Sequence, residues 1–258
     1  MTVTSIFRMD DTNVGDWWCP PELYFPDLAG DRRDILEVGD KTTLDRVVLG
    51  GGGLIARTFD QVMRELAEQR PPKARIVAWG IGESLNIDRS GGFVSPYDGV
   101  LPEYLSRFDL VGLRDFGTSY RWTPCASCMS PLFDAPPSPT QDVVIYEHKR
   151  IPIPIQGPER RSNSGNDLES VVAFLASAET VITNSYHGAY WATLLGRRVV
   201  AIPNMSKLYR LKHAPTLCRA EEWRRYRSCA VAYPEALEEC RAANRSFMND
   251  VRSVLKLN

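Results

Sequence analysis

Short, continuously apolar segments alternate along this chain with segments of helical periodicity, and this alternation constrains the fold more than any other feature. Strands that are apolar on both faces are typical of a buried parallel sheet, because a sheet with one wet face alternates apolar and polar residues. We expect such strands at residues 46–49, 75–79, 109–113, 142–146, 180–183 and 198–202. We expect helices at residues 58–69, 166–175 and 187–195, and from residue 234 onward. The pattern predicts an α/β fold.

A proline-rich stretch at residues 134–141 divides the chain near its middle. Three prolines without periodicity are typical of an extended linker. The sequence therefore predicts two domains, residues 1–134 and residues 135–258, each with a Rossmann-like parallel sheet, and a cleft between them. Ligands of such sheets bind outside the carboxyl ends of the strands.

Two expected helices have recognisable ends. Asn166, with Glu169 three residues later, predicts a capping box at a helix start, worth about 1 kcal/mol. Gly196 suits the position just past the end of the helix at residues 187–195.

The segment Thr183-Asn184-Ser185-Tyr186-His187-Gly188 lies between an expected strand and an expected helix. Free N–H groups and the dipole at a helix start favour an anion such as phosphate or carboxylate. A histidine there can give or take a proton near neutral pH. The alternative is structural: Ser185 or Asn184 caps the helix and His187 packs in the core.

Other candidate site residues also follow expected strands. Arg114 can bind an anion or pair with Asp115, and Lys207 can bind an anion or remain solvated. The remaining candidates lie in two turns, at Asn13, Gly15 and Asp16 and at Gly51 and Gly52. The first turn can face a ligand or be an Asx-turn with a helix cap. The second can approach a ligand closely or be a simple tight turn.

Composition and charge exclude several functions. The 258 residues have a formal net charge of −1, which does not favour nucleic-acid binding. We expect no signal peptide, no membrane span and no cofactor, and six reduced cysteines in the cytoplasm. Cys125 and Cys128 form a lone Cys-x-x-Cys, for which we expect neither zinc nor a disulfide. A basic, aromatic stretch at residues 219–227 is either a solvated helix face or a peripheral membrane contact.

Several of these segments together resemble the polysaccharide pyruvyl transferase family. The segment from Thr183 to Gly188, its helix and the strand at 198–202 resemble the family's C-terminal signature. Asn13-Val14-Gly15-Asp16, the glycine turn at residues 50–53 and Gly112-Leu113-Arg114-Asp115 resemble further family segments and occur in the same order.

The resemblance implies a fold of glycosyltransferase B type and the transfer of pyruvate from phosphoenolpyruvate to a saccharide, free or lipid-linked, in exopolysaccharide or capsule synthesis. It implies that His187 is the acid/base and that Arg114, Asn184, Ser185, Gly188 and Lys207 bind the donor. Asn13, Gly15, Asp16, Gly51 and Gly52 would line the acceptor side or the cleft. It places the enzyme in the cytoplasm, free or at the inner face of the membrane.

The chain departs from the family at Ser185, where many members carry arginine. Two alternatives to pyruvyl transfer therefore stay open. One is a nucleotide-sugar glycosyltransferase of the same fold, and the other is a saccharide-binding relative without turnover.

Overall fold

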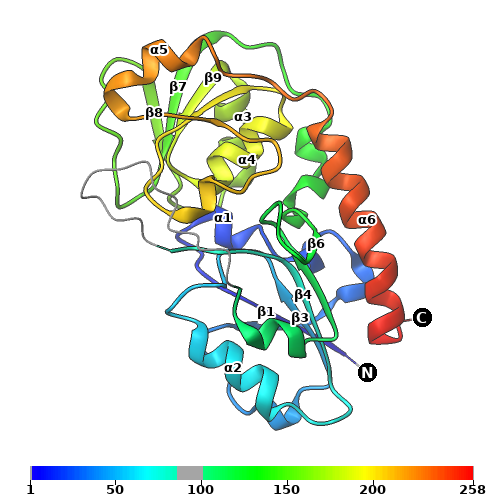
Figure 1. Ribbon diagram of the computed structural model, residues 1–258. Coiled ribbons are helices and arrows are strands. Elements are labelled where there is room, and N and C mark those ends of the chain that lie inside the picture. The colour runs from blue at the N-terminus through cyan, green and yellow to red at the C-terminus, as the bar shows by residue number, and fades with distance from the viewer. Residues whose placement is uncertain (1, 86–100, 258) are drawn as a thin grey trace.

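A computed structural model describes residues 2–85 and 101–257 and contains two sheets whose strands are all parallel (Figure 1). The first sheet consists of β1 (Val3–Phe7), β2 (Gly30–Asp34), β3 (Arg46–Gly50), β4 (Arg75–Ile81), β5 (Leu110–Leu113) and β6 (Arg121–Trp122). The second consists of β7 (Gln141–Glu147), β8 (Glu159–Ser162), β9 (Ala178–Thr183), β10 (Arg198–Ala201) and β11 (Thr216–Leu217). The α/β fold and the two parallel sheets predicted from the apolar runs are confirmed.

Strand order reverses once in each sheet. The first sheet runs β2-β1-β3-β4-β5-β6, so β1 lies between β2 and β3. The second runs β11-β10-β9-β7-β8, so β7 lies between β9 and β8. At such a reversal the connections leave in opposite directions and open a crevice at the carboxyl ends of the strands. The fold thus creates two crevices, one beyond β1 and β3 and one beyond β7 and β9.

Helices cover both faces of each sheet, which explains why the inner strands are apolar, whereas the edge strands β2 and β8 are charged. The helices are α1 (Val14–Trp17), α2 (Asp60–Gln69), α3 (Leu168–Ala176), α4 (Tyr186–Leu194), α5 (Trp223–Arg227) and α6 (Ala236–Leu255). Short 3₁₀ turns lie at Pro21–Leu23, Pro26–Leu28, Lys41–Thr43, Glu103–Arg107, Ala126–Met129, Pro131–Phe133, Ser206–Leu208 and Ala220–Glu222. α2 packs in one core of the first sheet, and α3 and α4 pack together in a core of the second.

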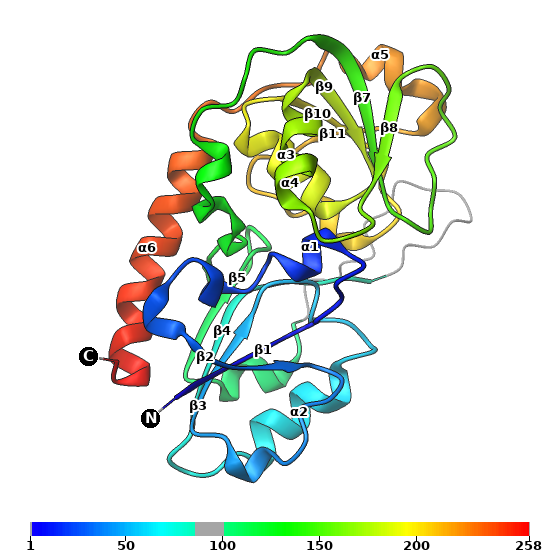
Figure 2. The same ribbon diagram turned by 180° about the vertical axis from the view of Figure 1, so that it is seen from behind.

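The last helix, α6, returns from the second half of the chain to the first sheet (Figures 1 and 2). Its Phe247 and Val251 share a core with Val77 and Trp79. The side chain of Asn244 accepts a hydrogen bond from the Trp79 indole at 2.7 Å. One sheet is formed by residues before the linker and the other by residues after it. Helix α6 follows the second sheet in the sequence but packs on the first sheet. The division at residues 134 and 135 stays a prediction.

The predicted capping box at Asn166 and Glu169 is wrong. α3 begins at Leu168, and its N-cap is Asp167, which accepts the backbone N–H of Ser170 at 3.0 Å. Aspartate and asparagine are both good N-caps, so their neighbouring positions could not be separated from the sequence.

The start and end of α4 agree with the sequence within one residue. Ser185 is its N-cap, and Gly196 follows its end with φ +68°, a conformation that suits glycine. Among the helices of the described residues, none has the length and apolar character needed to cross a membrane.

The turn after β1 reaches into the second half of the molecule. The Val14 N–H donates to the Asn163 carbonyl at 3.2 Å, and the Asn163 amide donates to Asn13 Oδ1 at 3.0 Å. Lys149 Nζ donates to Thr12 Oγ1 at 2.6 Å. A separate contact joins the halves near Leu85, whose backbone N–H donates to Ser206 Oγ at 2.9 Å. These two contacts hold the crevices of the two sheets against each other.

Candidate active site

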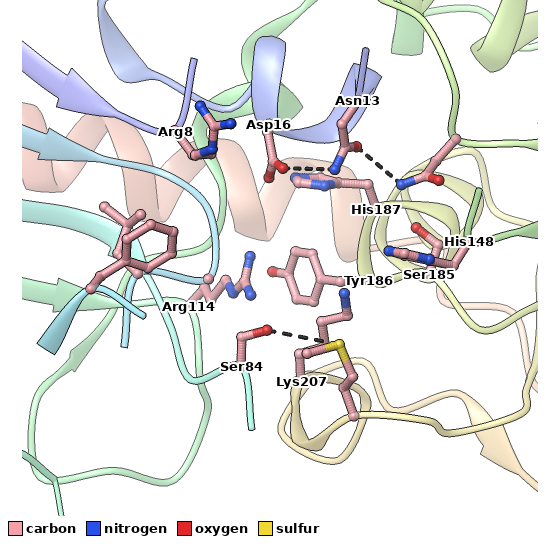
Figure 3. A pocket seen from close by; sticks show the side chains of 15 residues that line it. Arg8, Asn13, Asp16, Ser84, Arg114, His148, Ser185, Tyr186, His187 and Lys207 are labelled. Atoms are coloured by element: carbon pink, nitrogen blue, oxygen red, sulfur yellow. Dashed lines mark hydrogen bonds between the residues drawn. The ribbon is translucent and has the colours of Figure 1, made fainter. Parts of the chain in front are cut away.

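A pocket lies where the two crevices meet, and Figure 3 shows the side chains that line it. It encloses about 710 Å³ of space that no protein atom fills, part of it open to solvent. Its lining comes from both halves of the chain: Arg8, Asn13, Asp16, Gly53, Leu54, Phe59, Ser84, Arg114, His148, Asn163, Ser185, Tyr186, His187, Met205 and Lys207.

His187 lies in the first turn of α4 and is only 6% exposed. Its ring packs on Trp191, with centroids 4.9 Å apart, and its Nε2 lies 3.6 Å from the Cys125 thiol. Burial, together with the positive charges of Arg114 and Lys207, lowers the pKa of His187 well below its usual value. The ring is therefore neutral at physiological pH and can accept a proton.

Gly15 leaves the space that the His187 ring occupies. A Cβ atom at Gly15 would lie 2.1 Å from His187 Nδ1, closer than any real contact. The glycine of the Asn-x-Gly-Asp turn therefore lets the first half of the chain approach the histidine. Its role is close packing against the proposed acid/base, and it does not line the pocket itself.

Arg114 and Lys207 supply positive charge to the pocket. The Arg114 guanidinium lies 3.8 Å from the centre of the Tyr186 ring, and its buried Nε has no hydrogen-bond partner among the described residues. Within the same residues, Lys207 forms no ion pair, and burial and the Arg114 charge lower its pKa to about 8. Arg114 is buried and Lys207 is half-buried, and a cation removed from water without an ion pair is costly, so both groups favour an anionic ligand.

The alternative ion pair between Arg114 and Asp115 does not form in the described part of the chain. Asp115 Oδ2 instead accepts the backbone N–H of Glu83 at 2.6 Å. This contact ties the loop after β5 to the loop after β4, and it leaves the guanidinium available to the pocket.

Asn13 and Asp16 form the opposite wall. The Asn13 side chain donates to Asp16 Oδ2 at 2.6 Å and accepts the Gly15 N–H at 3.2 Å. Asn13 is also the N-cap of α1, so the capping alternative is correct and is compatible with a place in the pocket. Burial raises the pKa of Asp16. The wall thus presents an amide and a carboxyl group that can bind hydroxyls.

The structure brings six of the predicted site residues into this pocket: Asn13, Asp16, Arg114, Ser185, His187 and Lys207. Asn184 lies behind it and holds a turn, accepting the His148 N–H and donating to the Ile151 carbonyl, both at 2.7 Å. Gly188 packs against Thr183 and Tyr146, where a Cβ would lie 2.4 Å from Thr183 Oγ1.

The predicted glycines Gly51 and Gly52 form the turn after β3, with φ +71° and +84°. A Cβ at Gly51 would lie 2.5 Å from the Cys19 carbonyl oxygen. The turn brings their neighbour Gly53, and not these two glycines, to the pocket lining.

Sequence reasoning missed several lining residues, among them Arg8, His148, Asn163 and Tyr186. His148 and Arg8 each directly follow a strand end, at β7 and β1, and this position was the available signal. Asn163 also directly follows a strand end, at β8, but that short strand is charged and no apolar run predicted it.

The remaining motifs lie outside the pocket lining. Cys125 and Cys128 are free and buried, and the described residues hold no group of three His, Cys, Asp or Glu side chains that suits a metal ion. In the basic stretch at 219–227, Trp223 is 7% exposed and packs in a core of the second sheet, while Arg227 pairs with Asp142.

These features define an α/β protein with a pocket between two parallel sheets, lined by an arginine, a lysine and a neutral histidine at a helix start. A family model described as polysaccharide pyruvyl transferase matches residues 3–206. The chain therefore belongs to the polysaccharide pyruvyl transferase family, and the resemblance found in the sequence is confirmed.

Other comparisons are more distant. A search of curated proteins finds no match. A solved structure of a functionally uncharacterised protein from Klebsiella pneumoniae is similar with a TM-score of 0.48 and 14% identity, covering 84% of this chain and 92% of that one.

Proposed function

We propose that the protein transfers the pyruvyl group of phosphoenolpyruvate to two hydroxyls of a saccharide and forms a cyclic ketal. The observation that carries the proposal is the meeting of Arg114 and Lys207, neither in an ion pair among the described residues, with the neutral His187 in one pocket. Family membership supports a transferase that acts on a polysaccharide.

The donor carries two anionic groups, and the cations of the pocket match them. Arg114 has a planar fork that suits the carboxylate, and its unpaired Nε is one of the donors. Lys207 is a compact charge that suits the phosphate. The N–H groups at the start of α4, capped by Ser185, add to the attraction for negative charge.

The reaction needs a proton carrier beside the reacting carbon. One sugar hydroxyl attacks the carbon that bears the phosphate oxygen as the methylene carbon of the enol phosphate gains a proton, and phosphate leaves as the second hydroxyl closes the ketal. Two hydroxyl protons are released, and they end on the new methyl group and on phosphate. His187 accepts the first hydroxyl proton because its ring is neutral, and Asn13 and Asp16 orient the hydroxyls.

We further propose that the two-sheet arrangement is of glycosyltransferase B type and that the enzyme acts in exopolysaccharide or capsule synthesis in the cytoplasm. The acceptor is free or linked to a lipid at the inner face of the membrane. These statements rest on what the family implies.

The donor can be identified by thermal stability. Phosphoenolpyruvate at 100 times its dissociation constant should stabilise the protein by about 2.7 kcal/mol, and UDP-glucose should not. Arg114→Gln should remove the stabilisation. Arg121→Gln is the matched control, because Arg121 pairs with Asp250 outside the pocket. Stabilisation by UDP-glucose but not by phosphoenolpyruvate would favour a glycosyltransferase instead.

A further inference from the structure

His148 follows β7 at the strand reversal of the second sheet and lines the pocket (Figure 3). Its Nδ1 accepts the backbone N–H of Arg150 at 3.2 Å. A ring nitrogen that accepts a hydrogen bond carries no proton, so the single proton of the neutral ring is on Nε2. The backbone thereby selects the tautomer of His148.

The turn that carries His148 is held from two directions. Asn184 accepts the His148 N–H and donates to the Ile151 carbonyl, both at 2.7 Å. The Lys149 N–H donates to Asn163 Oδ1 at 2.7 Å. The ring is thus presented to the pocket by a turn whose backbone is fixed, as preorganised binding requires.

His148 stays neutral over the physiological range. Burial and the positive charges of Lys207, Lys149 and Arg150 lower its pKa to about 4. A neutral ring with its proton on Nε2 is a hydrogen-bond donor that adds no charge. Among the described residues, Nε2 has no hydrogen-bond partner.

We propose that His148 is a substrate-binding residue whose Nε2–H donates to the phosphate group of the donor, beside Lys207. The inference rests on the proposed function. The phosphate is the matching group because its tetrahedral oxygens can meet two donors from different directions, whereas the planar carboxylate suits the fork of Arg114.

Two substitutions separate a binding role from a structural one. In His148→Asn the amide oxygen can replace Nδ1 as acceptor for Arg150, but nothing reaches the position of Nε2. In His148→Gln the longer amide can place an N–H near the Nε2 position, but the acceptor for Arg150 is lost. A binding residue should tolerate glutamine better, and a structural residue should tolerate asparagine better.

The test is calorimetric titration of the full chain with inorganic phosphate and, separately, with phosphoenolpyruvate. We expect His148→Asn to weaken both affinities about 10- to 100-fold, as for a lost hydrogen bond to a charged group. His148→Gln should stay within about fivefold of the unaltered protein. His213→Asn is the matched control, since His213 pairs with Glu239 outside the pocket, and its affinities should not change.

Three outcomes overturn the inference: unchanged phosphate affinity in His148→Asn, weaker binding in His148→Gln than in His148→Asn, or no phosphate affinity in the unaltered protein. If the unaltered protein binds phosphate but not phosphoenolpyruvate, the proposed donor is wrong. The phosphate titrations of the two variants then still decide the role of His148. Melting temperatures without ligand show that each variant is folded.

Discussion

Burial sets the protonation state of several side chains in this pocket. His187 and Lys207 both lose basicity when removed from water, and each also feels the charge of Arg114. Burial also raises the pKa of Asp16, which lies on the opposite wall. The pocket therefore disfavours the charged form of its acidic and basic groups alike, and it leaves His187 as a neutral proton acceptor.

His187 should be essential for turnover. We expect His187→Ala and His187→Gln to lower the rate per folded molecule by at least about 10²-fold, because the proton carrier is lost. The ring packs on Trp191, so the alanine variant should also lose about 1–3 kcal/mol of stability. Rates normalised to the folded fraction from circular dichroism measure the first effect alone.

A control with a comparable loss of stability makes this test specific. Met63→Ala empties a core position of the first sheet far from the histidine and should leave the rate per folded molecule unchanged. Normal turnover by folded His187→Ala would remove the central residue of the proposed mechanism.

The pH dependence of kcat/KM should report Lys207. Below its pKa of about 8 the side chain is protonated and binds the anionic donor. As pH rises through 8 the charge is lost, so kcat/KM should fall. Lys207→Arg should move this fall to higher pH, because arginine stays charged.

Lys212→Arg serves as the control, because Lys212 pairs with Glu239 outside the pocket. This substitution should leave the pH profile unchanged. A profile of the unaltered protein that stays flat to pH 9 would contradict the role of Lys207.

At the scale of elements, the start of α4 combines a structural role with a place in the pocket lining. Ser185 Oγ accepts the Gly188 N–H at 3.4 Å, and the same residue lines the pocket. The sequence allowed either a capped helix start or a functional one. The structure shows that the capping interpretation of Ser185 is correct, and the residue also lies in the proposed site.

Loss of the α4 cap should lower both the stability of the protein and its affinity for the donor. Ser185→Ala should cost about 1 kcal/mol of stability and weaken phosphoenolpyruvate binding about two- to fivefold, because the first turn then holds its N–H groups less firmly. Asp167→Ala removes the cap of α3 outside the pocket and should cost similar stability without changing affinity. If calorimetry gave equal affinities for the two variants, the cap of α4 would have no role in donor binding.

At the scale of the whole molecule, the two halves are joined at the pocket and again along α6 (Figure 2). The turn after β1 brings Asn13 to Asn163, and α6 brings Asn244 to the indole of Trp79. Both joints use buried amides that contact residues more than 100 positions away. Their hydrogen bonds form only when both halves are folded.

The α6 joint should therefore be a major source of stability. Asn244 is fully buried and also donates to the Cys240 carbonyl at 2.9 Å. Asn244→Ala leaves the Trp79 N–H buried without a partner and should lower the free energy of unfolding by about 2–4 kcal/mol. Asn249→Ala, at an exposed position of the same helix, should change it by less than about 0.5 kcal/mol. Urea unfolding of both variants measures the difference, and equal values would contradict a stabilising role for the joint.

Local sequence determined the elements and the places where chemistry could occur. Apolar runs predicted the inner strands, because a strand that is buried on both faces is apolar at successive positions. This pattern can be recognised without knowing the fold. The rule that ligands lie beyond strand ends then selected Arg114, His187 and Lys207, which line one pocket.

Only the tertiary structure decided which strand ends meet and what the glycines do. Strand order places β1 and β7 at the reversals, so it brings Arg8 and His148 to the pocket, and no local pattern encodes that order. Gly15 looked like a turn residue, but it is required because His187 lies against it. The protonation states of His187 and Lys207 likewise follow from burial between two halves of the chain, which is a property of the packed molecule.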